Sequence, residues 1–225
     1  MTKPRDTTRY GNAAIVLHWT IAALILYNLY LGLKYAGLGT LYLFHIPVFT
    51  SLPGSPLVLG LPYDEAQGLA SFTLLQLHKS IGFTVLALSL IRLAMRLTFY
   101  PPPPEPESLH GWEKAASAVV HWGFYAIMIG LPLTGWVMVS ASRTNIPTLL
   151  FDKVPFPHLG FIHSLPRPQR RMVDATFTDL HLRLVNVTFA LLALHIGAAL
   201  KHQFIDRDAV VGRMIPFLRP KSRPL

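Results

Sequence analysis

Two histidines in the last long apolar stretch of the chain, His181 and His195, have a spacing that suits two metal centres. An α-helix turns about 100° and rises about 1.5 Å per residue, so a step of fourteen residues returns to within roughly 40° of the same helix face and separates the imidazoles by roughly 21 Å. One helix can therefore serve two sites, one near each surface of a membrane. Polar side chains in the hydrocarbon region normally face the bundle interior and mark function.

Each of these histidines has a candidate partner at the same depth on an earlier apolar stretch. With the amino terminus inside the cell, His18 and His195 share the inner level, whereas His78 and His181 share the outer level. The two imidazoles of a pair could approach a planar ligand from opposite sides. Two neutral nitrogen ligands on one iron give a low-spin centre suited to electron transfer, without an open position for oxygen chemistry. The pattern therefore predicts two stacked haems.

Other interpretations of the membrane histidines stay open. A single membrane histidine can hydrogen-bond across helices for packing, at a net gain of about 0.6 kcal/mol. His121, in the third apolar stretch, lies near the inner level, where it could replace His18 or His195 as a ligand, transfer protons or contact quinone. His202, at the inner end of the fourth stretch, could do similar work or lie among the lipid headgroups.

The elements that must position these residues are membrane-spanning helices. The chain is 52% hydrophobic, with a mean hydropathy of +0.41 and 14% charged residues, against roughly 25% in ordinary soluble domains. A bilayer core about 30 Å thick needs about 20 apolar residues, and four stretches reach that length, at about 13–33, 74–99, 115–140 and 180–204. Residues 1–225 are predicted to form one all-α membrane domain, a four-transmembrane-helix bundle. The long external loops, 34–73 and 141–179, contain aromatic and apolar residues that favour ordered caps.

The basic residues favour a cytoplasmic position for both termini. With the amino terminus inside, twelve of the twenty Lys and Arg residues fall on the inner side, in line with the positive-inside bias. The net charge of +9 then reflects anchoring at anionic lipid and a basic outer loop. Nucleic-acid binding is a poor explanation, because the charge is divided among several membrane-flanking segments. The chain has no cysteine, so neither disulfides nor thiolate-held metal clusters are available.

Several short motifs follow one another along nearly the whole chain. They are residues 10–19 (YGNAAIVLHW), residues 78–82 (HKSIG) with Arg92 and Arg96, His121 followed by Leu131, Pro132 and Gly135, and His181 and His195 followed by residues 201–216 (KHQFIDRDAVVGRMIP). Together they resemble the prokaryotic cytochrome b561 family. The resemblance implies a multi-pass protein of the bacterial inner membrane that holds two b haems. His18 and His195 would bind the cytoplasmic haem, and His78 and His181 the periplasmic one.

The resemblance also implies an electron-transfer function. Members of the family pass electrons to or from quinone, and one branch is similar to superoxide oxidase, which takes electrons from periplasmic superoxide and reduces ubiquinone. A basic outer loop before His181 would attract a small anion, and the candidate residues for it are Lys153, Arg167, Arg170 and Arg171. The same stretch could instead be solvated or bind headgroups. The candidates for quinone or proton contacts, by position, are His121, His202, Lys79 and Arg183.

Three functions compete at this point. The first is a dihaem oxidoreductase that takes electrons from superoxide and reduces ubiquinone. The second is a relay subunit between the quinone pool and a separate periplasmic redox protein. The third is a haem-free proton or metal transporter, which the lack of paired acidic residues in the spans disfavours. The expected partners are membrane lipid, quinone, and either superoxide or a periplasmic redox protein.

Overall fold

The computed structural model describes residues 10–35, 40–41, 46–47, 63–98, 103–104, 109–144 and 146–218. The long helices are α1 (Asn12–Tyr35), α2 (Tyr63–Thr98), α3 (Gly111–Ala141) and α5 (Arg167–Leu200). The short elements are strands β1 (Thr40–Leu41), β2 (Ile46–Pro47), β3 (Thr148–Leu150) and β4 (Val154–Phe156), helix α4 (Gly160–His163), and the turns of helix η1 (Lys201–Asp206), η2 (Val211–Arg213) and η3 (Pro216–Leu218). Most of the first long loop, 34–62, and with it the predicted ordered cap there, lies outside the described residues.

Within the described residues, four helices are long and apolar enough to cross a membrane. They cover Asn12–Lys34, Phe72–Thr98, Gly111–Ala141 and Arg167–Asp206. These helices contain the four stretches predicted from hydropathy, apart from one residue at the end of the second. Helices α2 and α5 begin before the apolar stretches that they contain. Backbone hydrogen bonds define a helix, so it can include polar residues outside the apolar stretch. Residues 63–73 and 167–179 are therefore helical and not loop.

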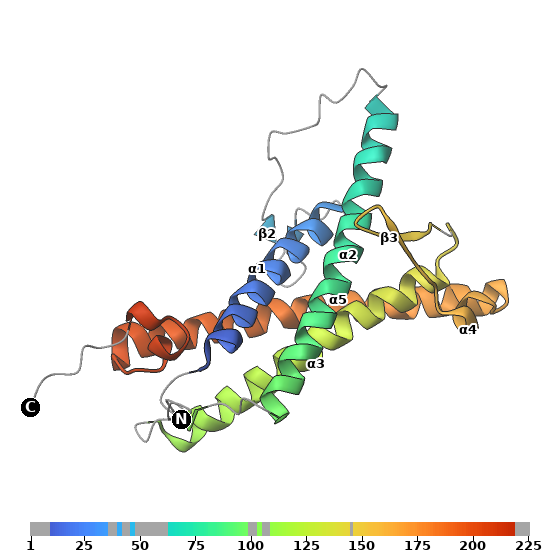
Figure 1. Ribbon diagram of the computed structural model, residues 1–225. Helices are drawn as coiled ribbons and strands as arrows, with labels where there is room; N and C mark the ends of the chain where they lie inside the picture. The colour runs from blue at the N-terminus through green and yellow to red at the C-terminus, as the bar shows by residue number, and fades with distance from the viewer. Residues whose placement is uncertain are drawn as a thin grey trace, which may run out of the picture.

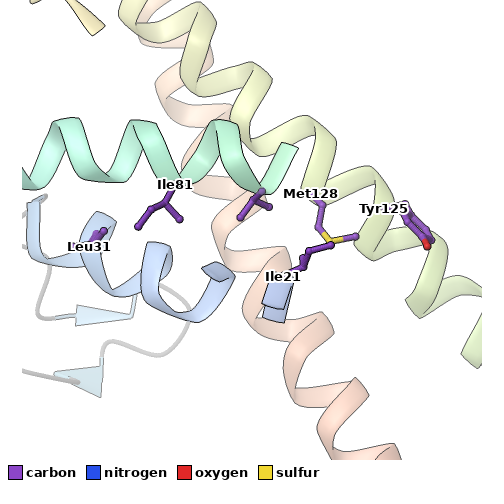
Figure 2. Close-up of a cluster of buried hydrophobic side chains, with 6 residues drawn as sticks. Ile21, Leu31, Ile81, Tyr125 and Met128 are labelled. Carbon is purple, nitrogen blue, oxygen red and sulfur yellow. The ribbon is translucent and has the colours of Figure 1, made fainter. Parts of the chain in front are cut away.

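The four long helices form two packed pairs. Helix α1 lies against α2, and α3 lies along α5, while contacts between α2 and α3 join the pairs (Figure 1). The buried core lies where α1, α2 and α3 meet and contains Ile21, Leu31, Ile81, Tyr125 and Met128, with Ile21 of α1 beside Met128 of α3 (Figure 2). Large apolar side chains also cover the outside of the helices, as a lipid environment requires.

Polar contacts tie the second long connection to the middle of α2. The Gln76 amide donates from Nε2 to the Pro147 carbonyl oxygen at 2.7 Å and accepts at Oε1 from the Leu149 amide at 3.3 Å. The Ser80 hydroxyl accepts from the Phe151 amide at 2.8 Å. Antiparallel strands β3 and β4 form a hairpin against this part of α2, with Leu149 opposite Pro155. The connection is ordered through these polar contacts, and two of its large apolar side chains, Phe151 and Phe161, are exposed.

The two described chain ends meet at the opposite end of the helices. The Trp19 indole of α1 donates to the Met214 carbonyl oxygen at 3.1 Å. Arg213 donates from Nη1 to the Pro104 carbonyl oxygen at 2.7 Å, and Lys201 donates from Nζ to Glu113 Oε1 at 2.8 Å. The start of α1, the link between α2 and α3, and the segment after α5 therefore lie together.

Candidate functional site

Two histidines from different helices face each other near the hairpin. His78 of α2 and His181 of α5 have ring centroids 6.3 Å apart, with an angle of 73° between the ring planes. A cavity of about 370 Å³ is lined by both rings and by residues of all four long helices. Aliphatic and aromatic side chains dominate its walls, including Ile25, Phe124 and Leu182. We call His78 and His181 the outer pair.

A second pair of histidines faces each other toward the end where Trp19 contacts Met214. His18 of α1 and His195 of α5 have ring centroids 6.1 Å apart, with an angle of 63° between the planes. The step of fourteen residues along α5 separates His181 from His195 by roughly 21 Å along the helix axis. We call His18 and His195 the inner pair. The structure thus brings together the same two pairs that depth along the helices predicted.

Hydrogen bonds fix the tautomer of both outer rings. His78 Nδ1 lies 3.1 Å from the Asn28 carbonyl oxygen, which can only accept, so Nδ1 carries the proton. The Thr134 hydroxyl donates to the Leu131 carbonyl oxygen at 2.8 Å, and it can accept from His181 Nδ1 at 2.9 Å. In both rings this leaves Nε2 unprotonated and free to bind a metal, which is the usual arrangement of a ligating histidine.

Glycines let the helices approach the outer pair closely. A Cβ atom added to Gly32 would lie 3.0 Å from His78 Cε1 and 3.3 Å from its Nδ1. At Gly135 an added Cβ would lie 3.6 Å from His181 Cε1, which is an ordinary contact. A side chain at position 32 would therefore be in tight contact with the His78 ring, which would have to give by a few tenths of an ångström. Neither Gly32, Thr134 nor the Asn28 carbonyl was among the predicted site residues.

Comparison with known proteins identifies the family. A model of the prokaryotic cytochrome b561 family matches residues 9–217. The chain belongs to that family. "Cytochrome b561 homolog 1" of Escherichia coli (strain K12) is 28% identical over 142 residues, which is 62% of this chain and 73% of the homologue. "Probable superoxide oxidase CybB" of Yersinia pestis is 26% identical over 144 residues, again 62% of this chain and 73% of that protein. "Cytochrome b561 homolog 2" of E. coli is 28% identical over 141 residues, 62% and 69% of the two chains.

As a prokaryotic cytochrome b561, the protein is a multi-pass bacterial membrane protein that binds b-type haem and takes part in electron transfer. The outer and inner pairs are compatible with this cofactor. A metal-to-imidazole bond is about 2.0–2.1 Å long and the ring centre lies about 1.1 Å behind the nitrogen, so two imidazoles on opposite sides of one ion have centroids about 6.3 Å apart. The measured 6.3 and 6.1 Å agree with that spacing.

A third imidazole lies at the inner level of this cytochrome b561. The His121 ring has its centroid 5.6 Å from that of His195, and its Nδ1 lies 3.2 Å from the Ser117 hydroxyl. Phe124 lies 5.5 Å from His195, and Trp19 lies 5.2 Å from His18. The inner rings are therefore held by aromatic neighbours.

His202 takes part in an ion-pair network at the same end as the Trp19–Met214 contact. Its Nδ1 lies 2.8 Å from Asp208 Oδ2 and 3.1 Å from Asp206 Oδ2, and Lys201 Nζ lies 2.6 Å from the same Asp206 oxygen. Neither histidine pair contacts this network in the part of the chain that is described. Arg183 is also apart from the pairs, because its guanidinium is exposed and paired with Asp179 at 2.7 Å.

The predicted basic residues of the second long connection fall into two groups. Lys153, Arg167 and Arg171 are exposed. Arg170 instead lies half-buried and donates to the carbonyl oxygens of His163 at 3.2 Å and Ser142 at 3.4 Å. Arg170 therefore ties α5 to the segment before it, while the other three present their charges to solvent.

Proposed function

We propose that this cytochrome b561 holds two b haems and carries electrons from a periplasmic donor, superoxide, to ubiquinone. His78 and His181 would bind the outer haem, and His18 and His195 the inner one. The observation that carries the proposal is the matched separation of the two pairs, 6.3 and 6.1 Å between ring centroids. Packing alone gives no reason for two histidine pairs to share the spacing of imidazoles on opposite sides of one metal ion.

The inner ligand on α1 is His18 in this proposal, although His121 lies nearer to His195. The 5.6 Å between the His121 and His195 centroids is shorter than the about 6.3 Å that two imidazoles on opposite sides of an ion require. The Nδ1 of His121 has a hydroxyl partner, Ser117, at 3.2 Å on the same helix. His121 is thus free for proton transfer or quinone contact at the inner haem.

The haem supplies the one-electron chemistry, and the protein sets its ligation, burial and orientation. At the outer level the protons on Nδ1 of His78 and His181 are held by an oxygen acceptor, which keeps each Nε2 directed away from that acceptor. The rigid α5 helix keeps the two sites about 21 Å apart from ligand to ligand. The hairpin is tied to α2 at Gln76 and Ser80, on either side of His78 in the sequence, and so braces the helix that carries this ligand.

Superoxide as the donor is supported by two observations. The Yersinia pestis relative is named a probable superoxide oxidase. Lys153, which precedes β4, and Arg167 and Arg171, in the first turns of α5, are exposed and positively charged, and such a charge raises the encounter rate of a small anion. With His78 and His181 both holding the outer haem, that haem would supply one-electron chemistry, by which superoxide would be oxidised to oxygen.

We further propose that both termini lie in the cytoplasm of an inner-membrane protein, so that the hairpin end is periplasmic. The contact of Trp19 with Met214 supports a shared side for the two ends. Ubiquinone reduction would then take place near the inner haem, where His121 and the His202 network offer groups that can carry protons.

The test is a reduced-minus-oxidised visible spectrum of the purified protein with a haem-to-protein ratio, followed by addition of superoxide and a ubiquinone analogue. We expect a low-spin b-type spectrum at two haems per chain and electron transfer from superoxide to quinone. The same spectrum without superoxide-driven reduction would favour a relay to a separate periplasmic redox protein. Protein made with ample haem that shows no haem bands would overturn the proposal.

A further inference from the structure

A buried lysine beside the outer pair has no partner for its charge. Lys79 follows His78 on α2 and has 8% of its surface exposed. Its Nζ atom is buried and makes no hydrogen bond within the described residues. A charged group taken out of water is costly unless it is paired and hydrogen-bonded. An unpaired buried ammonium therefore points to an anion that the protein binds.

The cavity supplies the direction in which that anion lies. Lys79 lines the same cavity as His78 and His181. Among the described residues that line the cavity, Lys79 is the one lysine or arginine, and none is an aspartate or glutamate. A negatively charged group in the cavity would thus meet a single cation, at the outer level.

The hairpin places Lys79 at the outer end of that cavity. Gln76 and Ser80, which flank Lys79 on α2, both bond to the backbone of the hairpin segment. His158, which follows the hairpin, has a pKa lowered by burial and further by the neighbouring charges of His163 and Lys79. A histidine side chain is neutral or cationic and never anionic, so His158 supplies no counter-charge at this end and the charge of Lys79 is left for a ligand.

We propose that Lys79 binds a propionate carboxylate of the haem held by His78 and His181. The inference rests on the proposed outer haem. Haem b carries carboxylates on one edge, and an ammonium-to-carboxylate hydrogen bond is charge-assisted and about twice as strong as a neutral one. Lys79 is a positioning residue that directs this edge toward the hairpin and holds the cofactor in place.

The experiment compares Lys79→Met with wild type by redox titration of both haems and by the rate of haem loss to apomyoglobin. Removal of a positive charge beside the haem favours the oxidised iron, so we expect the reduction equilibrium constant of the outer haem to fall about tenfold, which is about 59 mV for one electron. Loss of the outer haem should also become faster. His181→Ala, which should keep only the inner haem, assigns the two potentials.

Three variants serve as controls. Lys79→Arg keeps the charge and should retain most of the wild-type potential and haem retention. Lys34→Met removes an exposed charge from the last turn of α1. This variant should keep the haem potential and the rate of haem loss close to those of wild type. Lys79→Gln removes the charge but keeps a polar side chain, and it replaces Lys79→Met if that variant does not fold.

Four results would overturn the inference. One is an equal potential and an equal rate of haem loss in wild type and Lys79→Met. Another is a lowered potential without faster haem loss, which would mean that the charge acts through space without a carboxylate contact. A wild-type potential that changes on addition of acetate would identify an exchangeable solution anion instead. Fewer than two haems per chain in wild type would overturn the proposed function as well, whereas the first three results leave that proposal standing.

Discussion

The outer and inner histidine pairs have nearly the same ring separation but are held by different contacts. The rings of His78 and His181 each have an oxygen acceptor for the Nδ1 proton, the Asn28 carbonyl and the Thr134 hydroxyl. Within the described residues, the rings of His18 and His195 have aromatic contacts and no hydrogen bond. The same ligand geometry can thus be reached by directional bonds or by packing alone.

This difference predicts that haem binding at the outer pair and at the inner pair responds to different kinds of substitution. A directional hydrogen bond fixes which nitrogen faces the metal, so its loss allows the wrong tautomer and weakens the ligand. Aromatic packing restricts where the ring lies but leaves the tautomer free. The outer site should therefore respond to changes in single polar atoms, and the inner site to changes in the shape and charge of its neighbours.

The largest effect separates the two levels completely. His181→Ala removes a ligand of the outer haem but leaves the inner ligand His195, fourteen residues further along α5, unchanged. We expect one haem per chain in place of two, with the potential of the inner haem retained, by pyridine haemochrome assay and redox titration. The matched variant His195→Ala should give the reverse. Loss of the inner haem in His181→Ala, with the outer haem kept, would contradict the pairing.

The next prediction concerns the choice of ligand at the inner level. His18→Ala should remove the inner haem, whereas His121→Ala should keep two haems per chain and lower the rate of quinone reduction. The reason is that the ring spacing of His18 and His195, 6.1 Å, fits opposed axial ligands better than the 5.6 Å of His121 and His195. The reverse pattern of haem loss would make His121 the ligand.

A smaller effect is expected at Gly32. Its substitution by alanine places a methyl group 3.0 Å from His78 Cε1, and the ring or the helix must shift. Overpacking of this kind typically costs about 1–3 kcal/mol, so outer haem retention should fall while the inner haem is unaffected. Gly197→Ala is the control, because nothing lies within 4 Å of the added Cβ on that side. Equal haem retention in both variants would mean that the helices around Gly32 adjust freely.

The sequence predicted the helices and the histidine pairs, but not the contacts that orient the rings. The pairs follow from helix rise and apolar length, which depend on residue numbers alone, so His18, His78, His181 and His195 could be matched by depth. The contact of His78 is with a backbone carbonyl, and every residue has one, so no side-chain type signals it. Thr134 offered a weak signal, as a hydroxyl in an apolar stretch, but such a hydroxyl usually bonds within its own helix.

The Thr134 hydroxyl gives a test of the directional bond at the outer level. Thr134→Val keeps the shape of the side chain but removes the acceptor of the His181 Nδ1 proton. Loss of such a partner typically weakens metal binding about 10- to 100-fold, and we expect the lower end, about tenfold faster haem loss at the outer level. Thr188→Val is the control, since the Thr188 hydroxyl also lines the cavity but donates only to the Leu184 carbonyl oxygen of its own helix. Equal rates in the two variants would contradict a role for the hydrogen bond.

The smallest effect is expected from surface charge, and it should again distinguish the two ends. The double variant Arg167→Gln and Arg171→Gln removes two exposed charges at the start of α5 without touching either histidine pair. Because a positive surface speeds the encounter with an anion, the rate of reduction by superoxide should fall about two- to fivefold at low salt. The difference should shrink at 0.5 M salt, since the screening length at 0.1 M is already about 10 Å and falls further with added salt.

The matched variant for this last effect is Arg207→Gln, which removes an exposed charge at the opposite end. If the hairpin end receives superoxide, Arg207→Gln should leave the superoxide rate unchanged and both haem potentials as in wild type. The same loss of rate per charge removed, so that Arg207→Gln shows about half the logarithmic loss of the double variant, would mean that net charge alone sets the encounter. A larger loss in Arg207→Gln than in the double variant would place the entry of superoxide at the inner level, and the proposed orientation in the membrane would be wrong. The number of haems per chain does not reveal which side of the membrane each histidine pair faces. The comparison of the charge variants tests that orientation.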